Sequence, residues 1–188
     1  QKMITDTRYN EEDIMSVIDY LKEQSDGGFN PDILETARHF YSDEAKGTWE
    51  PEKVIKGHDV LIIGTGPATA KHRNAIESYI KIHRPFVIAL NTQKSISEEL
   101  INARAACHPV RILSDCNEYL NLPQPLIAPA SMLPGNVKKK LQQKELFDFD
   151  VSVNVDRFTF NASNCTIPNL LVLSYALAIA TSGKAEKI

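Results

Sequence analysis

Two kinds of hydrophobic pattern divide the chain. Near the start, apolar side chains recur at helical spacing, as in Ile14, Val17, Ile18 and Leu21. After about residue 58, short continuous apolar runs rich in β-branched residues alternate with helical patterns. The pattern therefore predicts a small helical segment followed by an α/β domain.

The second part of the chain contains several predicted strands and helices. The strands are expected at 59–63, 86–90, 110–113, 126–128 and 149–155, with 158–160 extending or pairing with the last. The helices between and after them are expected at 67–83, 96–106, 114–119, 136–141 and 168–183. Strands that alternate with helices predict a Rossmann-like, mostly parallel sheet with helices on both faces.

The charge distribution changes near residue 55. Residues 1–55 carry 13 acidic and 6 basic side chains, whereas residues 56–188 carry 11 acidic and 15 basic ones. This change predicts an acidic helical segment and linker over 1–55 and the Rossmann-like α/β domain over 56–188. The mildly basic second part fits a small anionic ligand, but it lacks the clustered Lys and Arg of a nucleic-acid surface.

Several classes of protein do not fit this sequence. No apolar run is long enough to cross a membrane, and no secretory signal opens the chain. The cysteines Cys107, Cys116 and Cys165 are too scattered for a disulfide framework or a zinc site. We therefore expect a cytoplasmic protein with reduced thiols, without membrane or nucleic-acid partners. A helix start could lower the pKa of the Cys165 thiol, but a structural role is the preferred interpretation.

The sharpest feature is a glycine-rich turn between the first predicted strand and its helix. The turn consists of Gly64, Thr65, Gly66, Pro67 and Ala68. Glycines let backbone approach a phosphate closely, and a helix start offers amide donors and partial positive charge. The turn lacks the third glycine of the dinucleotide fingerprint and the ending of a Walker loop. Phosphate or nucleotide binding is slightly favoured over a tight turn that needs glycine for its own geometry.

Polar residues follow the next predicted strands at the same edge. Asn91 and Thr92 end the second strand, where nucleotide-binding folds contact a ribose or base, although a simple strand-ending turn is an equal alternative. Asp115 is expected just after the third strand, where it could meet a hydroxyl or a metal-bound phosphate, or cap a helix. Lys71, His72 and Arg73 lie within about a turn of the helix start and could add positive charge.

Two stretches resemble known families. Residues 59–70, with Asn91 and the alanine-rich helix before Lys187, resemble the Rossmann-like domain of the hydroxymethylpterin diphosphokinase-like group. That group has a Gly-x-Gly-Pro-Ser turn, and Ala68 stands here in place of the serine. Residues 1–45 resemble the segment that follows the barrel in putative aldolases similar to 4-hydroxy-2-oxovalerate aldolase.

The resemblance implies that the chain is the C-terminal region of a putative aldolase. The divalent metal of such a barrel is held by a His-x-His pair and an Asp, which these residues lack, so this region is expected to bind no such metal. It is then a non-catalytic domain whose partners are the N-terminal aldolase barrel of the same parent chain and a small phosphorylated ligand. A nucleotide or nucleotide sugar with Mg²⁺ is the expected ligand, and the acidic helices could form a homodimer contact.

Two alternatives remain open at this point. One is a stand-alone enzyme that transfers a diphosphate or glycosyl group, with Asp115 as the carboxylate that holds Mg²⁺. The other is a structural or oligomerisation domain with a vestigial loop, which Ala68 in place of serine would explain. The residues after Gly183 have the pattern of a lead into another buried strand, so we expect a chain truncated at both ends.

Overall fold

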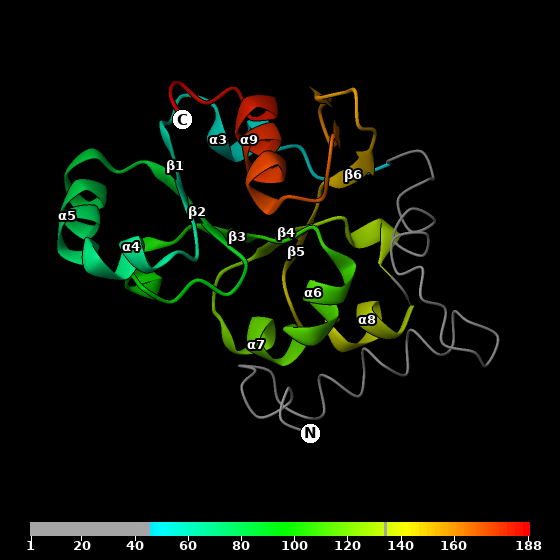
Figure 1. Ribbon diagram of the computed structural model, residues 1–188, viewed down its shortest axis with the longest axis horizontal. Coiled ribbons are helices and arrows are strands. Elements are labelled where there is room, and N and C mark those ends of the chain that lie inside the picture. The colour runs from blue at the N-terminus through cyan, green and yellow to red at the C-terminus, as the bar shows by residue number, and fades with distance from the viewer. Residues whose placement is uncertain (1–45, 134) are drawn as a thin grey trace.

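A computed structural model describes residues 46–133 and 135–188 (Figure 1). The helices predicted before residue 46 lie outside these residues. The described part is built on a sheet of five parallel strands in the order β1-β2-β3-β4-β5. The strands are β1 (Val60–Ile63), β2 (Phe86–Leu90), β3 (Ala103–Ala105), β4 (Leu126–Ala128) and β5 (Leu146–Asp148). This arrangement confirms the prediction of a Rossmann-like α/β fold.

The helices that connect these strands lie on one face of the sheet. They are α4 (Pro67–Lys71), α5 (Arg73–His83), α6 (Pro109–Ser114), α7 (Cys116–Asn121) and α8 (Gly135–Lys140), with short 3-10 turns at Glu98–Leu100 and Ala130–Met132. The strand order follows the chain, so every crossover moves the same way across the sheet, and crossovers of one hand then lie on one face. Ile80 of α5 packs in the cluster that contains Val87, and Ile112 of α6 packs in the cluster that contains Leu126.

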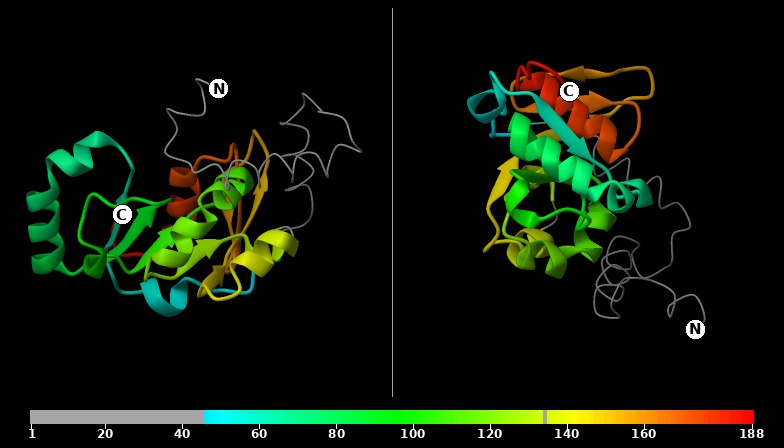
Figure 2. Two further views of the ribbon diagram at one scale, coloured as in Figure 1. Left: turned by 90° about the horizontal axis from the view of Figure 1, so that it is seen from below. Right: turned by 90° about the vertical axis from the view of Figure 1, so that its left-hand side faces the viewer.

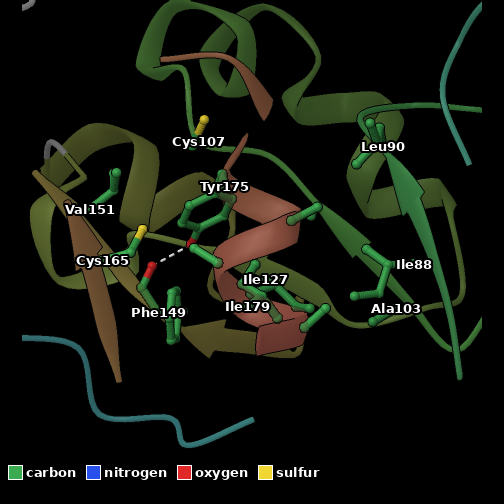
Figure 3. Packing of buried hydrophobic residues seen from close by; sticks show 14 of the residues in the cluster. Ile88, Leu90, Ala103, Cys107, Ile127, Phe149, Val151, Cys165, Tyr175 and Ile179 are labelled. Carbon is green, nitrogen blue, oxygen red and sulfur yellow. Dashed lines mark hydrogen bonds between the residues drawn. The ribbon is translucent and has the colours of Figure 1, made fainter. Parts of the chain in front are cut away.

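The opposite face is covered by α3 (Glu52–Ile55), α9 (Val172–Ser182) and a small second sheet (Figures 1 and 2). The second sheet contains β6 (Asp150–Val153), β7 (Thr159–Phe160) and β8 (Asn164–Ile167), in the order β6-β8-β7. Figure 3 shows α9 between Ile88 of the first sheet and Cys165 of the second. The Tyr175 hydroxyl of α9 donates to the Phe149 carbonyl, at the point where the chain passes from one sheet to the other.

Residues 46–55 are part of this packed unit. The amides of Thr48 and Trp49 donate to the Asp148 carbonyl oxygen, each at 2.9 Å. The Trp49 ring stacks on Phe147 with ring centroids 4.7 Å apart. Ile55 is fully buried in the core. The change in charge near residue 55 therefore lies inside the packed unit rather than at its border.

The chain after α9 runs along the outer edge of β1. The amide of Val60 donates to the Lys187 carbonyl at 2.8 Å, and the amide of Glu186 donates to the His58 carbonyl at 2.9 Å. These two bonds use the side of β1 that faces away from β2, so Glu186 and Lys187 extend the backbone pairing of the sheet at its first strand.

The prediction was wrong around the third strand. The helix expected over 96–106 is instead a 3-10 turn followed by β3, and the strand expected over 110–113 lies within α6. Alanine and arginine are strong helix formers, so the Ala103–Ala105 stretch has the composition of a helix. In the fold this stretch is the central strand, completely buried, and its two alanines fit under α9. Burial between two layers outweighs local propensity here.

The prediction also missed elements near the end of the chain. β5 and β8 were not expected, and residues 159–160 pair with β8 rather than with the strand at 150–153. Because β8 occupies 164–167, the last helix begins at Val172 instead of Pro168. These elements depend on pairing partners that are distant in sequence, which a local pattern does not reveal.

Candidate functional site

The glycine-rich loop connects the end of β1 to the start of α4. Gly66 is the N-cap residue, with φ −69° and ψ 157°, and Pro67 occupies the first helical position. The Thr69 amide donates to the Gly66 carbonyl at 3.2 Å, and this closes the first turn. After His72 the chain continues as α5, so the loop sits at the head of two successive helices.

The amides at the tip of the loop are open. Within the described residues, the backbone N–H groups of Thr65, Gly66 and Ala68 donate to no protein group. All three residues are exposed to solvent. These N–H groups are the donors that a helix start leaves without an intrahelical partner. They remain available to an acceptor that approaches from outside the chain.

Neither glycine of the loop is required by the backbone or by packing. Among the described glycines only Gly57 has a left-handed φ, of 80°. A Cβ built on Gly64 or Gly66 would meet nothing within 4 Å. By contrast, a Cβ on Gly183 would lie 2.7 Å from the Ile55 side chain. The interpretation of the loop as a turn that needs glycine for its own geometry therefore loses its physical basis.

A buried glutamine fixes the loop to the neighbouring strand end. The Gly64 carbonyl accepts hydrogen bonds from the Thr69 hydroxyl at 3.1 Å and from the side-chain amide of Gln93. Gln93 is 3% exposed, and its side-chain carbonyl also accepts the Ser95 amide. The loops after β1 and β2 are thus held together by one side chain. Sequence reasoning missed Gln93, because a glutamine in a loop carries no signal of burial.

Arg104 supports the loop after β2 by donating hydrogen bonds to its backbone. This β3 side chain is completely buried and donates from Nη1 to the Gln93 carbonyl at 2.6 Å and to the Asn91 carbonyl at 3.4 Å. Its Nε donates to the Gln124 side chain at 2.7 Å. Burial lowers the pKa of the guanidinium from its usual value. Arg104 was also missed, since it was placed in a helix expected over 96–106.

Asn91, Thr92 and Asp115 come together at the carboxyl edge of the sheet. Asn91 has a left-handed φ of 50°, and its amide donates to the Ala105 carbonyl at 2.9 Å. The Thr92 hydroxyl lies 3.5 Å from the Asp115 carboxylate. The sequence predicted that Asp115 follows a strand, and this is wrong. Asp115 lies between α6 and α7. Its carboxylate accepts the Arg111 Nε at 2.5 Å and is almost fully buried.

The basic side chains near the loop differ in whether they already bond to other side chains of the chain. Lys71 and His72 are exposed at the junction of α4 and α5. Arg73 donates to Glu77 at 2.7 Å and to the Ser97 hydroxyl at 2.9 Å. Lys71 and His72 are therefore better placed than Arg73 to add positive charge to a ligand at the loop.

The cysteines do not contribute a nucleophile to this edge. Cys107, Cys116 and Cys165 are buried thiols. Burial raises the pKa of Cys107 to about 12 and raises that of Cys165 as well, with the neighbouring Cys107 adding to the effect. The alternative of an activated Cys165 is wrong, because burial, together with the neighbouring Cys107 and Asp150, keeps the thiol protonated.

Comparison with known proteins identifies no relative: no family model, no curated protein and no solved structure matches the chain. Over the part of the chain that the structure describes, the helices are all too short or too polar for a membrane span. In the same part, no group of three or more His, Cys, Asp and Glu side chains is arranged to hold a metal ion. The site must therefore be interpreted from its own geometry.

Proposed function

We propose that this domain binds a small phosphorylated molecule, a nucleotide or nucleotide sugar, through the loop at 64–68. The observation that carries the proposal is that Gly64 and Gly66 have open space where a side chain would stand and no left-handed φ. Glycine at both positions is then explained by an object that approaches the backbone from outside. The open amides of Thr65, Gly66 and Ala68 point to an anionic acceptor.

The next strand end would contact the rest of the ligand. Asn91 and Thr92 lie at the carboxyl ends of the parallel strands, and ligands of open α/β sheets bind at this edge. The bonds from Gln93 to the Gly64 carbonyl and from Arg104 to the Gln93 carbonyl support the two loops. A prearranged loop loses little conformational entropy on binding, which favours affinity.

Binding is a better proposal than a transfer reaction. A transferase of this kind would need a carboxylate to hold Mg²⁺ beside the phosphate, and Asp115 was the candidate. Its carboxylate already accepts Arg111, with Thr92 at 3.5 Å, so orienting Thr92 is the role that fits its contacts. If Mg²⁺ accompanies the ligand, we expect the phosphate oxygens and water to supply most of its ligands.

We further propose a cellular context that rests on the resemblance described above. The domain would serve a cytoplasmic aldolase as the non-catalytic region behind the metal-dependent barrel, with the acidic segment as the contact to the barrel or to a second copy. Three buried cysteines that form no disulfide with one another fit a reducing compartment.

Calorimetric titration tests the binding proposal. The probes are inorganic phosphate, ATP, GDP and UDP-glucose, each with and without Mg²⁺, added to the chain and to its Gly66→Asp variant. Asp is a favourable N-cap residue and tolerates the φ of Gly66, so the variant is expected to fold. A carboxylate beside the open amides should weaken binding at least about tenfold, which corresponds to roughly 1.4 kcal/mol.

Gln143→Asp is the matched control. It adds the same charge at an exposed position before β5, and hence at the opposite, amino edge of the sheet. Its affinity should equal that of the unmodified chain. Equal affinity of the Gly66→Asp variant would remove the loop from the site, and no heat with any phosphorylated probe would refute the proposed function.

A further inference from the structure

Two buried carboxyl groups lie where the first sheet ends and the second begins. Asp148 is the last residue of β5, and Asp150 is the first residue of β6. Asp148 is 9% exposed and Asp150 is 1% exposed. Buried carboxylates are costly unless each charge is compensated, so the partners of both groups need to be accounted for.

Asp148 is well supplied with donors. Its Oδ1 accepts the Ser131 amide at 2.8 Å, and its Oδ2 accepts the Thr48 hydroxyl at 3.2 Å and the Ser131 hydroxyl. These donors favour its ionised form. Burial by itself would raise the pKa of Asp148, but the hydrogen bonds from Ser131 and Thr48 outweigh it and hold the pKa below the usual value.

Asp150 is not supplied in the same way. Its Oδ2 accepts the Lys46 amide at 2.8 Å, but its Oδ1 is shielded from solvent and has no donor. Asp150 accepts the Lys46 amide and Asp148 accepts the Thr48 hydroxyl, so both carboxyl groups face the same short segment. Two buried carboxylates so placed repel each other, which favours a proton on one of them. A proton on Asp150 would remove the charge from the group whose Oδ1 has no donor.

The pair also holds the segment 46–49, here called the strap. Asp150 accepts the Lys46 amide, Asp148 accepts the Thr48 hydroxyl, and the Asp148 backbone carbonyl accepts the amides of Thr48 and Trp49. Gly47 fits against the backbone of the sheet junction so closely that a Cβ would lie 2.7 Å from the Asp148 carbonyl. The strap covers the two carboxyl groups and leads toward residues 1–45.

We propose that Asp148 and Asp150 share one proton, carried by Asp150, and that loss of this proton loosens the strap. Two adjacent carboxylates repel each other and gain strongly from hydration. Water can reach both groups if the strap moves away, since the strap is bonded to both of them, whereas the turn that carries Ser131 is bonded to Asp148. The pair would thus couple pH to the docking of the segment that leads to the N-terminal region.

Burial, modified by the surrounding charges, places the loss of this proton near pH 6, since the pKa of Asp150 is raised to about 6. Burial raises the pKa of Asp150 to about 6 against the opposing hydrogen bond from Lys46, and the charge of Asp148 adds to the rise. Lys138 on α8 acts in the opposite direction. Cys165 of β8 stays neutral because burial raises its pKa, and the Tyr175 hydroxyl of α9 donates to the Phe149 carbonyl.

Trp49 offers a direct readout of the strap. It is the single tryptophan of the chain, and it stacks on Phe147, beside Asp148. Fluorescence and near-ultraviolet circular dichroism of the full chain, titrated from about pH 4.5 to about pH 8, should show one transition with a midpoint of about 6. Asp150→Asn has no carboxyl group to ionise, so the transition should disappear and the signal stay at its acidic level.

Asp156→Asn, in an exposed loop after β6, is the matched control and should keep the transition. A transition that persists unchanged in Asp150→Asn would assign it to another group, such as a histidine, and overturn the proposal. Carboxyl carbon NMR of the unmodified chain gives a second test that needs no variant. One of the two groups should titrate near 6 and the other below its usual range, and two groups that both titrate below about 4.5 would refute the shared proton.

Divalent cations test whether a metal ion, rather than a proton, lies between the two carboxyl groups. If a cation rather than a proton joins the two carboxyl groups, millimolar MgCl₂ or CaCl₂ should hold Trp49 at its acidic signal above the midpoint. That result would overturn the proposal, whereas a midpoint insensitive to both salts supports it. The test is independent of the ligand proposed for the glycine-rich loop.

Discussion

Alanine at the glycines of the β1–α4 loop separates a requirement of the fold from a requirement of binding. A Cβ on Gly64 or Gly66 meets nothing within 4 Å, and neither residue has a left-handed φ. Replacing glycine by alanine at a compatible site stabilises a protein by about 0.4–1 kcal/mol, because the unfolded chain loses freedom. At Gly66 this gain is offset by a cost of roughly 0.5 kcal/mol, since alanine is a poor N-cap residue.

The expected free energy of unfolding is therefore about 0.4–1 kcal/mol above that of the unmodified chain for Gly64→Ala, and within about 0.5 kcal/mol of it for Gly66→Ala. Gly183→Ala is the contrasting control, because its Cβ would lie 2.7 Å from the Cβ and 2.8 Å from the Cγ2 of Ile55. Overpacking against this fully buried side chain should cost about 1–3 kcal/mol. Gly47→Ala should cost about 3 kcal/mol or more, because its Cβ would lie 2.1 Å from a backbone oxygen of Ser163, which moves less easily than a side chain.

Urea unfolding followed by Trp49 fluorescence measures these differences as shifts of the midpoint at constant slope. The same proteins are then titrated with the best phosphorylated probe, and Gly66→Ala should bind it at least about tenfold more weakly, since a methyl group blocks the approach to the amides. A loss of more than about 1 kcal/mol of stability in Gly64→Ala or Gly66→Ala would refute the reasoning, because the glycines would then serve the fold itself.

Buried groups give three further predictions. Tyr175→Phe leaves the Phe149 carbonyl without the Tyr175 hydroxyl in the core, and urea unfolding should show a loss of about 1–3 kcal/mol, whereas the exposed Tyr79→Phe should be neutral. The thiols of Cys107 and Cys165 should fail to react with a disulfide reagent at pH 8 in the folded chain and should react fully in urea, since burial raises their pKa. Rapid reaction of the folded chain would contradict their burial. The pKa of Asp150 rises from 3.8 in the unfolded chain to about 6 in the folded one. Its contribution to stability is therefore complete below pH 3.8 and is lost as the pH rises through 6. The urea midpoint should accordingly be lower at pH 7 than at pH 5 in the unmodified chain, and Asp150→Asn should lack this difference.

The strand and loop that carry the candidate site could be predicted from local pattern. Val60–Ile63 and Phe86–Leu90 are continuous apolar runs, and short runs of this kind are typical of a strand covered on both faces. The turn after the first run and Asn91 after the second follow directly, because the carboxyl ends of parallel strands meet at one edge.

The supports of the site could not be predicted in the same way. Gln93 and Arg104 hold the loops in place, but nothing in their sequence neighbourhood marks a buried glutamine or a buried arginine. Their burial results from contacts between β1, β2 and β3, which are far apart along the chain. Ala103–Ala105 shows the same limit, because its helical composition is outweighed by a central place in the sheet.

By itself, the sequence determined the α/β class, the first two strands and the glycine-rich turn, because hydrophobic periodicity and turn chemistry act over neighbouring residues. Only the tertiary structure decided which strand follows Asn91, where Asp115 lies, and that Asp148 and Asp150 are buried under the strap. These outcomes depend on which distant surfaces exclude water from each other. Burial of that kind sets both the pKa values and the hydrogen-bond partners of the groups involved.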